Sequence, residues 1–166
     1  NAYSNDDVLI PMNVVRRGRR VWFEARAVSY EDTTEQLGAE FQRRVRIGAG
    51  NYQSLVWLMD FFSPFRGWPA FCYVSHKAIR WLSPLLVVAS LVSCSVLCVV
   101  TAAHLYCLML GLGLAFITAG LSSRLVPTRI TGSIYYFLAM NTALLLGLFR
   151  FMGGIKSAAW DRTARS

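Results

Sequence analysis

Apolar residues fill the second half of the chain without leaving a polar helix face. From Trp81 to Ser123 the sequence contains no Asp, Glu, Lys or Arg, and a second apolar run covers residues 130–149. About 20 apolar residues are enough to cross the hydrocarbon layer of a bilayer, so the pattern predicts membrane-spanning helices. We place them at residues 82–101, 105–121 and 130–149.

The first half mixes apolar and charged positions in short elements. Ser4 or Asn5 can cap a helix that Gly18 ends. Residues 20–30 have the composition of one or two β-strands. All but one of the acidic residues lie within the first sixty positions, so this part of the chain is expected to face water.

Two amphipathic helices are predicted between these elements and the apolar half. They cover residues 35–47 and 51–62, and Gly48-Ala49-Gly50 separates them. Aromatic residues then crowd the chain up to Trp81. Amphipathic helices that combine Trp, Phe and Arg commonly lie in the headgroup plane, so we interpret residues 48–80 as interfacial.

The positions of the charged residues along the chain indicate a binding partner. The chain carries 17 Lys and Arg against 9 Asp and Glu, and cations flank the apolar runs at Arg124, Arg129, Arg150 and Lys156. Such flanking cations are typical of membrane spans beside anionic lipid, whereas a nucleic-acid binder carries a basic face on a soluble fold. The pattern therefore favours membrane lipids as a partner and argues against nucleic acid.

The orientation in the membrane has two solutions. Lys77 and Arg80 place the start of the first span on the cytoplasmic side. Three spans would then leave the basic tail, residues 150–166, on the far side, which the same bias disfavours. Either the tail is an exception or one apolar run does not cross.

The four cysteines predict no special chemistry. Cys94 and Cys98 lie four apart on one face of an apolar helix, and Cys107 follows. A metal site needs several thiolates or imidazoles in one place, whereas Cys in apolar helices behaves as a small hydrophobe. We predict neither a metal ligand set nor a disulfide framework.

Two groups of charged residues can carry chemistry. Asp6 and Asp7 begin a helix, where the helix dipole favours a carboxylate that can act as a general base; ordinary capping is the alternative. Arg43 and Arg46 are three apart on one helix face and can clamp a diphosphate. The alternative for the arginines is a basic face that touches anionic lipid.

The order of these parts carries a resemblance to a known family. The segment Asn5-Asp-Asp-Val-Leu-Ile-Pro-Met, followed by Gly18 to Glu31, looks like the acidic base motif and later strands of membrane-integrated family-two glycosyltransferases. That family includes cellulose, hyaluronan and poly-N-acetylglucosamine synthases. The second acid of its motif is the catalytic base, so the resemblance implies this role for Asp7, with Asp6 as its neighbour.

A second segment resembles the family's arginine motif, Gln-x-x-Arg-Trp. It runs from Glu40 to Gly50, and Arg46 falls on the motif's Arg. Arg43 stands where the motif has Gln, and Ile47 stands where it has Trp. In the processive synthases the Gln and Trp of the motif help to bind the acceptor end and the donor diphosphate. The resemblance therefore implies sugar transfer and leaves processivity open.

The resemblance also implies an organisation. We expect an α-helical membrane region that follows the C-terminal fragment of an α/β nucleotide-sugar domain. The upstream part of that domain would hold the nucleotide and a divalent cation, Mg²⁺ or Mn²⁺, with ligands outside this chain, which should be inactive alone. The expected parts are residues 1–47 (catalytic fragment), 48–80 (interfacial helices), 81–149 (membrane helices) and 150–166 (basic tail).

The expected function is therefore part of an inverting membrane glycosyltransferase in polysaccharide or glycan synthesis. Its partners would be a nucleotide-sugar donor, a glycan or lipid-linked acceptor and membrane lipids. Its expected location is a bacterial inner membrane, with the catalytic part in the cytoplasm. The alternative is a non-catalytic membrane module that recruits a soluble partner.

Overall fold

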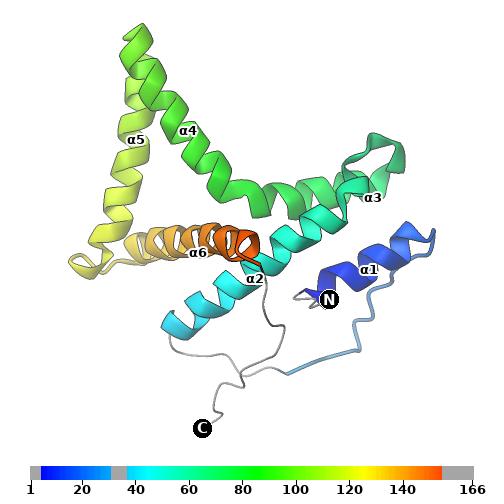
Figure 1. The fold of residues 1–166 in the computed structure, drawn as a ribbon. Helices are drawn as coiled ribbons and strands as arrows, with labels where there is room; N and C mark the ends of the chain where they lie inside the picture. The colour runs from blue at the N-terminus through cyan, green and yellow to red at the C-terminus, as the bar shows by residue number, and fades with distance from the viewer. Residues whose placement is uncertain (1–4, 31–36, 155–166) are drawn as a thin grey trace.

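The computed structural model describes residues 5–30 and 37–154, which form helices and irregular connections with no strand among them (Figure 1). In chain order the helices are α1 (Asp6–Arg16), α2 (Leu37–Trp57), α3 (Trp68–Tyr73), a π-helical turn (Val74–Ala78), α4 (Ile79–Thr101), α5 (His104–Leu121) and α6 (Arg129–Met152). Short 3₁₀ turns lie at Met59–Phe62, Pro64–Arg66 and Ser122–Arg124. The predicted cap Ser4, the helix start at Glu35 and most of the basic tail lie outside the described residues.

The long apolar helices follow the predicted runs. α4, α5 and α6 are each long and apolar enough to cross a membrane. α4 ends where Ala102 adopts a left-handed backbone, with φ of 48°, and α5 begins two residues later. In Figure 1 these two helices meet at that turn and diverge like the arms of a V, and α6 lies at the open end.

The predicted strand at residues 20–30 is wrong for the chain as described. Residues 19–30 are irregular, because a strand is stable only when its backbone pairs with a neighbouring strand and the described part of the chain offers none. Their large side chains are left in the open, with Trp22 exposed to 85%, Phe23 to 87% and Tyr30 to 94%.

The predicted break at Gly48-Ala49-Gly50 is also wrong, because α2 continues through it to Trp57. Gly48, together with Gly147 of α6, allows the two helices to approach closely. A Cβ on Gly48 would lie 3.3 Å from the Cα of Leu144, and a Cβ on Gly147 would lie 2.8 Å from the carbonyl oxygen of Val45. Packing at this distance compensates for the low helix propensity of glycine.

A compact apolar core joins the first half of the chain to the start of α4. Val8 and Leu9 of α1 pack with Tyr52 of α2, and the buried set also includes Leu55, Leu58, Phe61, Tyr73, Ala78 and Trp81. The hydroxyl of Tyr52 donates to the carbonyl oxygen of Trp81 at 3.0 Å, and burial raises the pKa of Tyr52 above its ordinary value. This core fixes α1 against α2.

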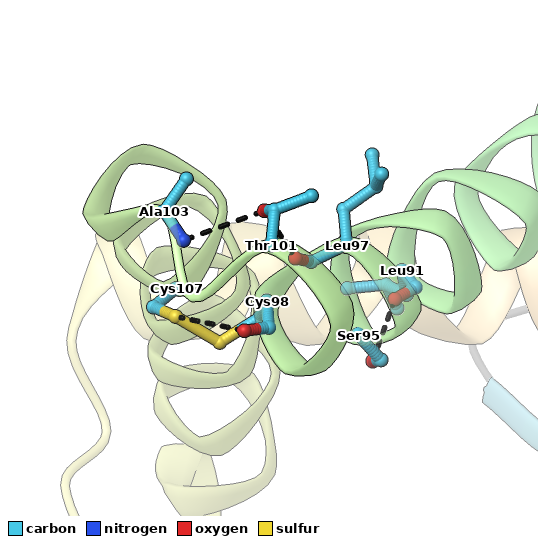
Figure 2. Close-up of a disulfide and its surroundings, with 7 residues drawn as sticks. All are labelled: Leu91, Ser95, Leu97, Cys98, Thr101, Ala103 and Cys107. Carbon is cyan, nitrogen blue, oxygen red and sulfur yellow. Dashed lines mark hydrogen bonds between the residues drawn. A yellow bond between two sulfur atoms is a disulfide. The ribbon is translucent and has the colours of Figure 1, made fainter.

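A disulfide joins α4 to α5, contrary to the sequence-based expectation. Cys98 and Cys107 are bonded beside the turn, with their Cα atoms 5.0 Å apart (Figure 2). Cys98 lies three residues before the end of α4, and Cys107 lies three residues after the start of α5. The tight turn therefore brings them face to face, a contact that helical spacing within one segment does not reveal. Cys94 stays a free thiol.

Candidate functional site

The acidic start of α1 is the first component of the candidate site. Asp6 and Asp7 occupy the first turn of α1 and both are exposed. Gly18, with φ of +74°, ends the helix region, as the sequence predicted. Its N–H donates to the carbonyl of Val15 and the N–H of the next residue donates to that of Val14, which is a Schellman pattern. The buried side chains of α1 face α2, so the two carboxylates are held at a fixed end of a packed helix.

A buried amide pair holds this acidic start to the middle of α2. Asn5 occupies the N-cap position, but its side chain does not cap the helix. Its Nδ2 instead donates to Oδ1 of Asn51 at 2.5 Å, and both residues are buried. Arg46 precedes Asn51 by five residues, or ~7.5 Å along the helix axis at 1.5 Å per residue. The bond therefore ties the acidic start of α1 to α2 about 1.4 turns beyond Arg46.

An ion pair holds the other end of α1. Arg16 donates from Nε and Nη2 to the two carboxylate oxygens of Asp60, at 3.1 and 2.5 Å, and also from Nη2 to the carbonyl of Trp57 at 2.7 Å. Arg66 pairs with the same carboxylate at 2.6 Å. Its guanidinium carbon also lies 4.9 Å from the ring centre of the buried Phe61. α1 is therefore tied to the α2 region at both ends.

The arginine helix carries its own carboxylate. Glu40 accepts from Nε of Arg44 at 2.6 Å and lies 3.9 Å from Nη1 of Arg43. Arg43 and Arg46 are half-buried, whereas Arg44 is exposed. The sequence analysis did not identify Glu40 or the Asn5–Asn51 pair as parts of the site. The i,i+4 spacing of Glu40 and Arg44 indicates their ion pair, whereas no local pattern indicates a bond between two amides 46 residues apart.

An open groove lies elsewhere on α2 and contains none of the four candidate residues. Its volume is about 510 Å³, and it lies between the start of α2 and the α5–α6 connection. It is lined by Gly38, Phe41, Gln42, Leu121, Arg124, Tyr135, Leu138, Ala139 and Thr142. We place the candidate site on α1 and α2, which carry Asp6 and Asp7 and Arg43 and Arg46.

The described residues do not form a metal centre. Within residues 5–30 and 37–154, no three His, Cys, Asp or Glu side chains gather closely enough to hold a metal ion. Asp6 and Asp7 provide two carboxylates without a third ligand.

The contribution of the Arg16–Asp60 ion pair to folding stability should depend on pH. The hydrogen bonds from Arg16 hold the pKa of Asp60 below its ordinary value of 3.8. Because the unfolded chain then binds the proton more tightly, this stabilisation is present above pH 3.8 and disappears as the pH falls through the lower folded value. Chemical denaturation in detergent between pH 6 and 3 should show a shallower acid loss in Asp60→Asn than in the wild type, and a cost of roughly 1 kcal/mol at neutral pH.

Its matched control is Glu24→Gln, which removes an exposed carboxylate that accepts only a local bond from the Arg26 backbone among the bonds described. That variant should keep the acid response of the wild type. Identical acid slopes for Asp60→Asn and the wild type would show that the pair does not contribute.

Comparison of the chain with models of known protein families, with curated proteins and with solved structures finds no match.

Proposed function

We propose that this chain is the acceptor-activating, membrane-seated part of an inverting glycosyltransferase. It would act with an upstream α/β domain that binds the nucleotide sugar, and transfer the sugar to a glycan or lipid-linked acceptor. The catalytic part would face the cytoplasm at the inner membrane. This proposal joins the family resemblance of the two motifs to their arrangement beside apolar helices.

The observation that carries the proposal is the buried Asn5–Asn51 hydrogen bond of 2.5 Å. It ties the acidic start of α1 to α2, although 46 residues separate the two amides. The reaction needs a general base for the acceptor and a cationic group for the leaving diphosphate. We propose that α1 supplies the first of these groups and α2 the second.

The reaction proposed for these residues is a single displacement. Asp7 takes the proton from an acceptor hydroxyl, and the oxygen attacks the anomeric carbon of the donor sugar. The bond from that carbon to the nucleotide diphosphate breaks, and the diphosphate leaves with the electron pair. Arg46, together with Arg43, stabilises its negative charge through charge-assisted hydrogen bonds.

The exposed aromatic residues of the α1–α2 connection support an upstream domain. Trp22 and Phe23 leave most of their surface in the open, and large apolar groups gathered on a surface usually mark a contact with another protein part. The segment has strand-forming composition without a strand partner in the described residues. Pairing with the edge of an upstream sheet would provide this partner and cover both rings.

The first test is sugar transfer by the full-length protein in isolated membranes, supplied with labelled uridine- and guanosine-diphosphate sugars. Arg46→Lys keeps the charge but removes the planar fork that binds a diphosphate at two points. We expect about a tenfold loss of kcat/KM, which corresponds to one charge-assisted hydrogen bond of about 1.4 kcal/mol.

Arg44→Lys is the matched control, because Arg44 lies on the same helix but is exposed and paired with Glu40. It should retain activity. Equal activity of both variants would contradict the role of Arg46. Absence of sugar transfer with every donor would favour the non-catalytic membrane module.

A further inference from the structure

α4 and α5 contact α6 at their ends away from the turn that joins them. The hydroxyl of Ser83 donates to Asn141 of α6 at 2.9 Å, and the ring of Phe116 lies 5.9 Å from that of Phe137. Ser83 is near the start of α4, and Phe116 is near the end of α5, so both contacts lie away from the disulfide turn. Figure 1 shows the same arrangement, with α6 across the open end of the V.

The second half of α6 continues past α5 and packs on the core that α1, α2 and the start of α4 form. Gly147 meets the backbone of α2 at Gly48. Leu148 and Phe151 pack against the core that includes Val8 of α1. A helix that crossed the bilayer beside α4 would instead end near the turn between α4 and α5.

α2 carries charges at the level of the middle of α6. Gly38, Phe41 and Gln42 lie opposite Leu138 and neighbouring positions of α6, as lining of one groove, and Gly48 lies opposite Leu144 and Gly147. Between these contacts α2 carries Glu40, Arg43, Arg44 and Arg46. If α6 spanned the membrane, these four charges would lie near the bilayer centre, where ionised side chains are strongly disfavoured.

The face of α6 from which Phe137 meets α5 also suits a lipid interface. Four of its six exposed large apolar side chains fall within a third of the circumference at 100° per residue: Ile130, Phe137, Phe149 and Met152. Exposed cations lie near its two ends, Arg129 and Arg150. An apolar face with flanking cations is typical of a helix seated in anionic headgroups.

The disulfide gives an independent indication from the opposite end of the hairpin. Disulfides form and persist in oxidising compartments and are rare in the cytoplasm. The Cys98–Cys107 bond lies beside the α4–α5 turn (Figure 2), so it favours a turn on the outer side. The cations at the other end, Lys77, Arg80 and Arg124, favour the cytoplasmic side by the positive-inside bias.

We infer that the chain crosses the bilayer twice, through α4 and α5, and that α6 lies with α2 along the cytoplasmic lipid surface. This arrangement places three groups of cations on the same side of the bilayer: those before α4, those between α5 and α6, and those at the end of α6. It removes the conflict between three apolar runs and the basic tail. The inference does not depend on sugar transfer.

Cysteine labelling tests which side α6 ends on. In the full-length protein with Cys72, Cys94, Cys98 and Cys107 replaced by serine, single cysteines are introduced as Arg150→Cys, Arg124→Cys or His104→Cys, all at exposed positions. An impermeant maleimide is added to sealed membrane vesicles of each orientation. Arg150→Cys should react in the same vesicles as Arg124→Cys and in the opposite vesicles from His104→Cys. Reaction of Arg150→Cys together with His104→Cys would overturn the inference.

A second measurement keeps every native residue and the disulfide. Green fluorescent protein is fused after Ser166 of the full-length protein, where it becomes fluorescent only if the tail stays in the cytoplasm. Two spans predict a fluorescent fusion in the membrane fraction. A membrane-bound fusion without fluorescence would place the tail outside and overturn the inference, even if the serine variants fail to fold.

Discussion

Asp7→Asn should lower the turnover of the full-length protein by about 10²–10⁴-fold, the usual contribution of a general base. The amide keeps the size of the side chain but cannot take a proton from the acceptor hydroxyl. Asp7 is exposed in the first turn of α1, and Asn is well tolerated at helix starts, so the fold should not change. The donor KM should stay close to that of the wild type, because the base acts on the acceptor.

The measurement is initial-rate sugar transfer in membranes over a range of donor concentrations. Glu24→Gln provides the control, since it removes another exposed carboxylate that lies outside the candidate site. It should retain full turnover. Full turnover in Asp7→Asn would refute the assignment of the base, whereas a rise in donor KM without a fall in kcat would place Asp7 in donor binding.

Gly147→Leu should be the most destabilising change in the helix packing described here. A Cβ at this position would lie 2.8 Å from three backbone atoms of α2, which belong to Val45, Gly48 and Ala49. Backbone atoms cannot rotate away as a side chain can, so α2 and α6 must separate. We expect a loss of about 3 kcal/mol, the upper range for overpacking, or roughly 100-fold in the ratio of folded to unfolded protein.

Thermal unfolding in detergent, followed by circular dichroism, measures this loss. Gly132→Leu is the matched control on the same helix, because nothing lies within 4 Å of a Cβ there and the better helix propensity of Leu should slightly stabilise α6. Equal melting temperatures for the two variants would show that the close approach of α2 and α6 does not contribute to stability.

The same contact explains why the α2 boundaries were mispredicted. Gly48-Ala49-Gly50 reads locally as a helix break, because glycine costs helix stability when nothing compensates for it. The compensation comes from α6, about 100 residues further along the chain. The opposite happens at residues 20–30, where strand-forming side chains stay irregular because no neighbouring strand is present among the described residues.

The candidate site was predictable only in its components. The sequence offered Asp6 and Asp7 at a helix start and Arg43 and Arg46 on one helix face, and these elements are present. Asn5, which the sequence offered together with Ser4 as the cap of α1, instead bonds Asn51 of α2. Both amides are buried, and buried polar groups need a hydrogen-bond partner, which each provides for the other.

The sequence by itself determined that the second half holds three helices long and apolar enough to cross a membrane, and where along the chain they lie. These properties depend on apolarity and backbone preference over a few neighbouring residues, so they can be read locally. Only the tertiary structure decided that α2 is continuous, that Cys98 meets Cys107 and that α6 turns back along α2 instead of following α4. Those outcomes depend on which distant surfaces fit together, and an apolar helix has the same local pattern whether it faces lipid or another helix.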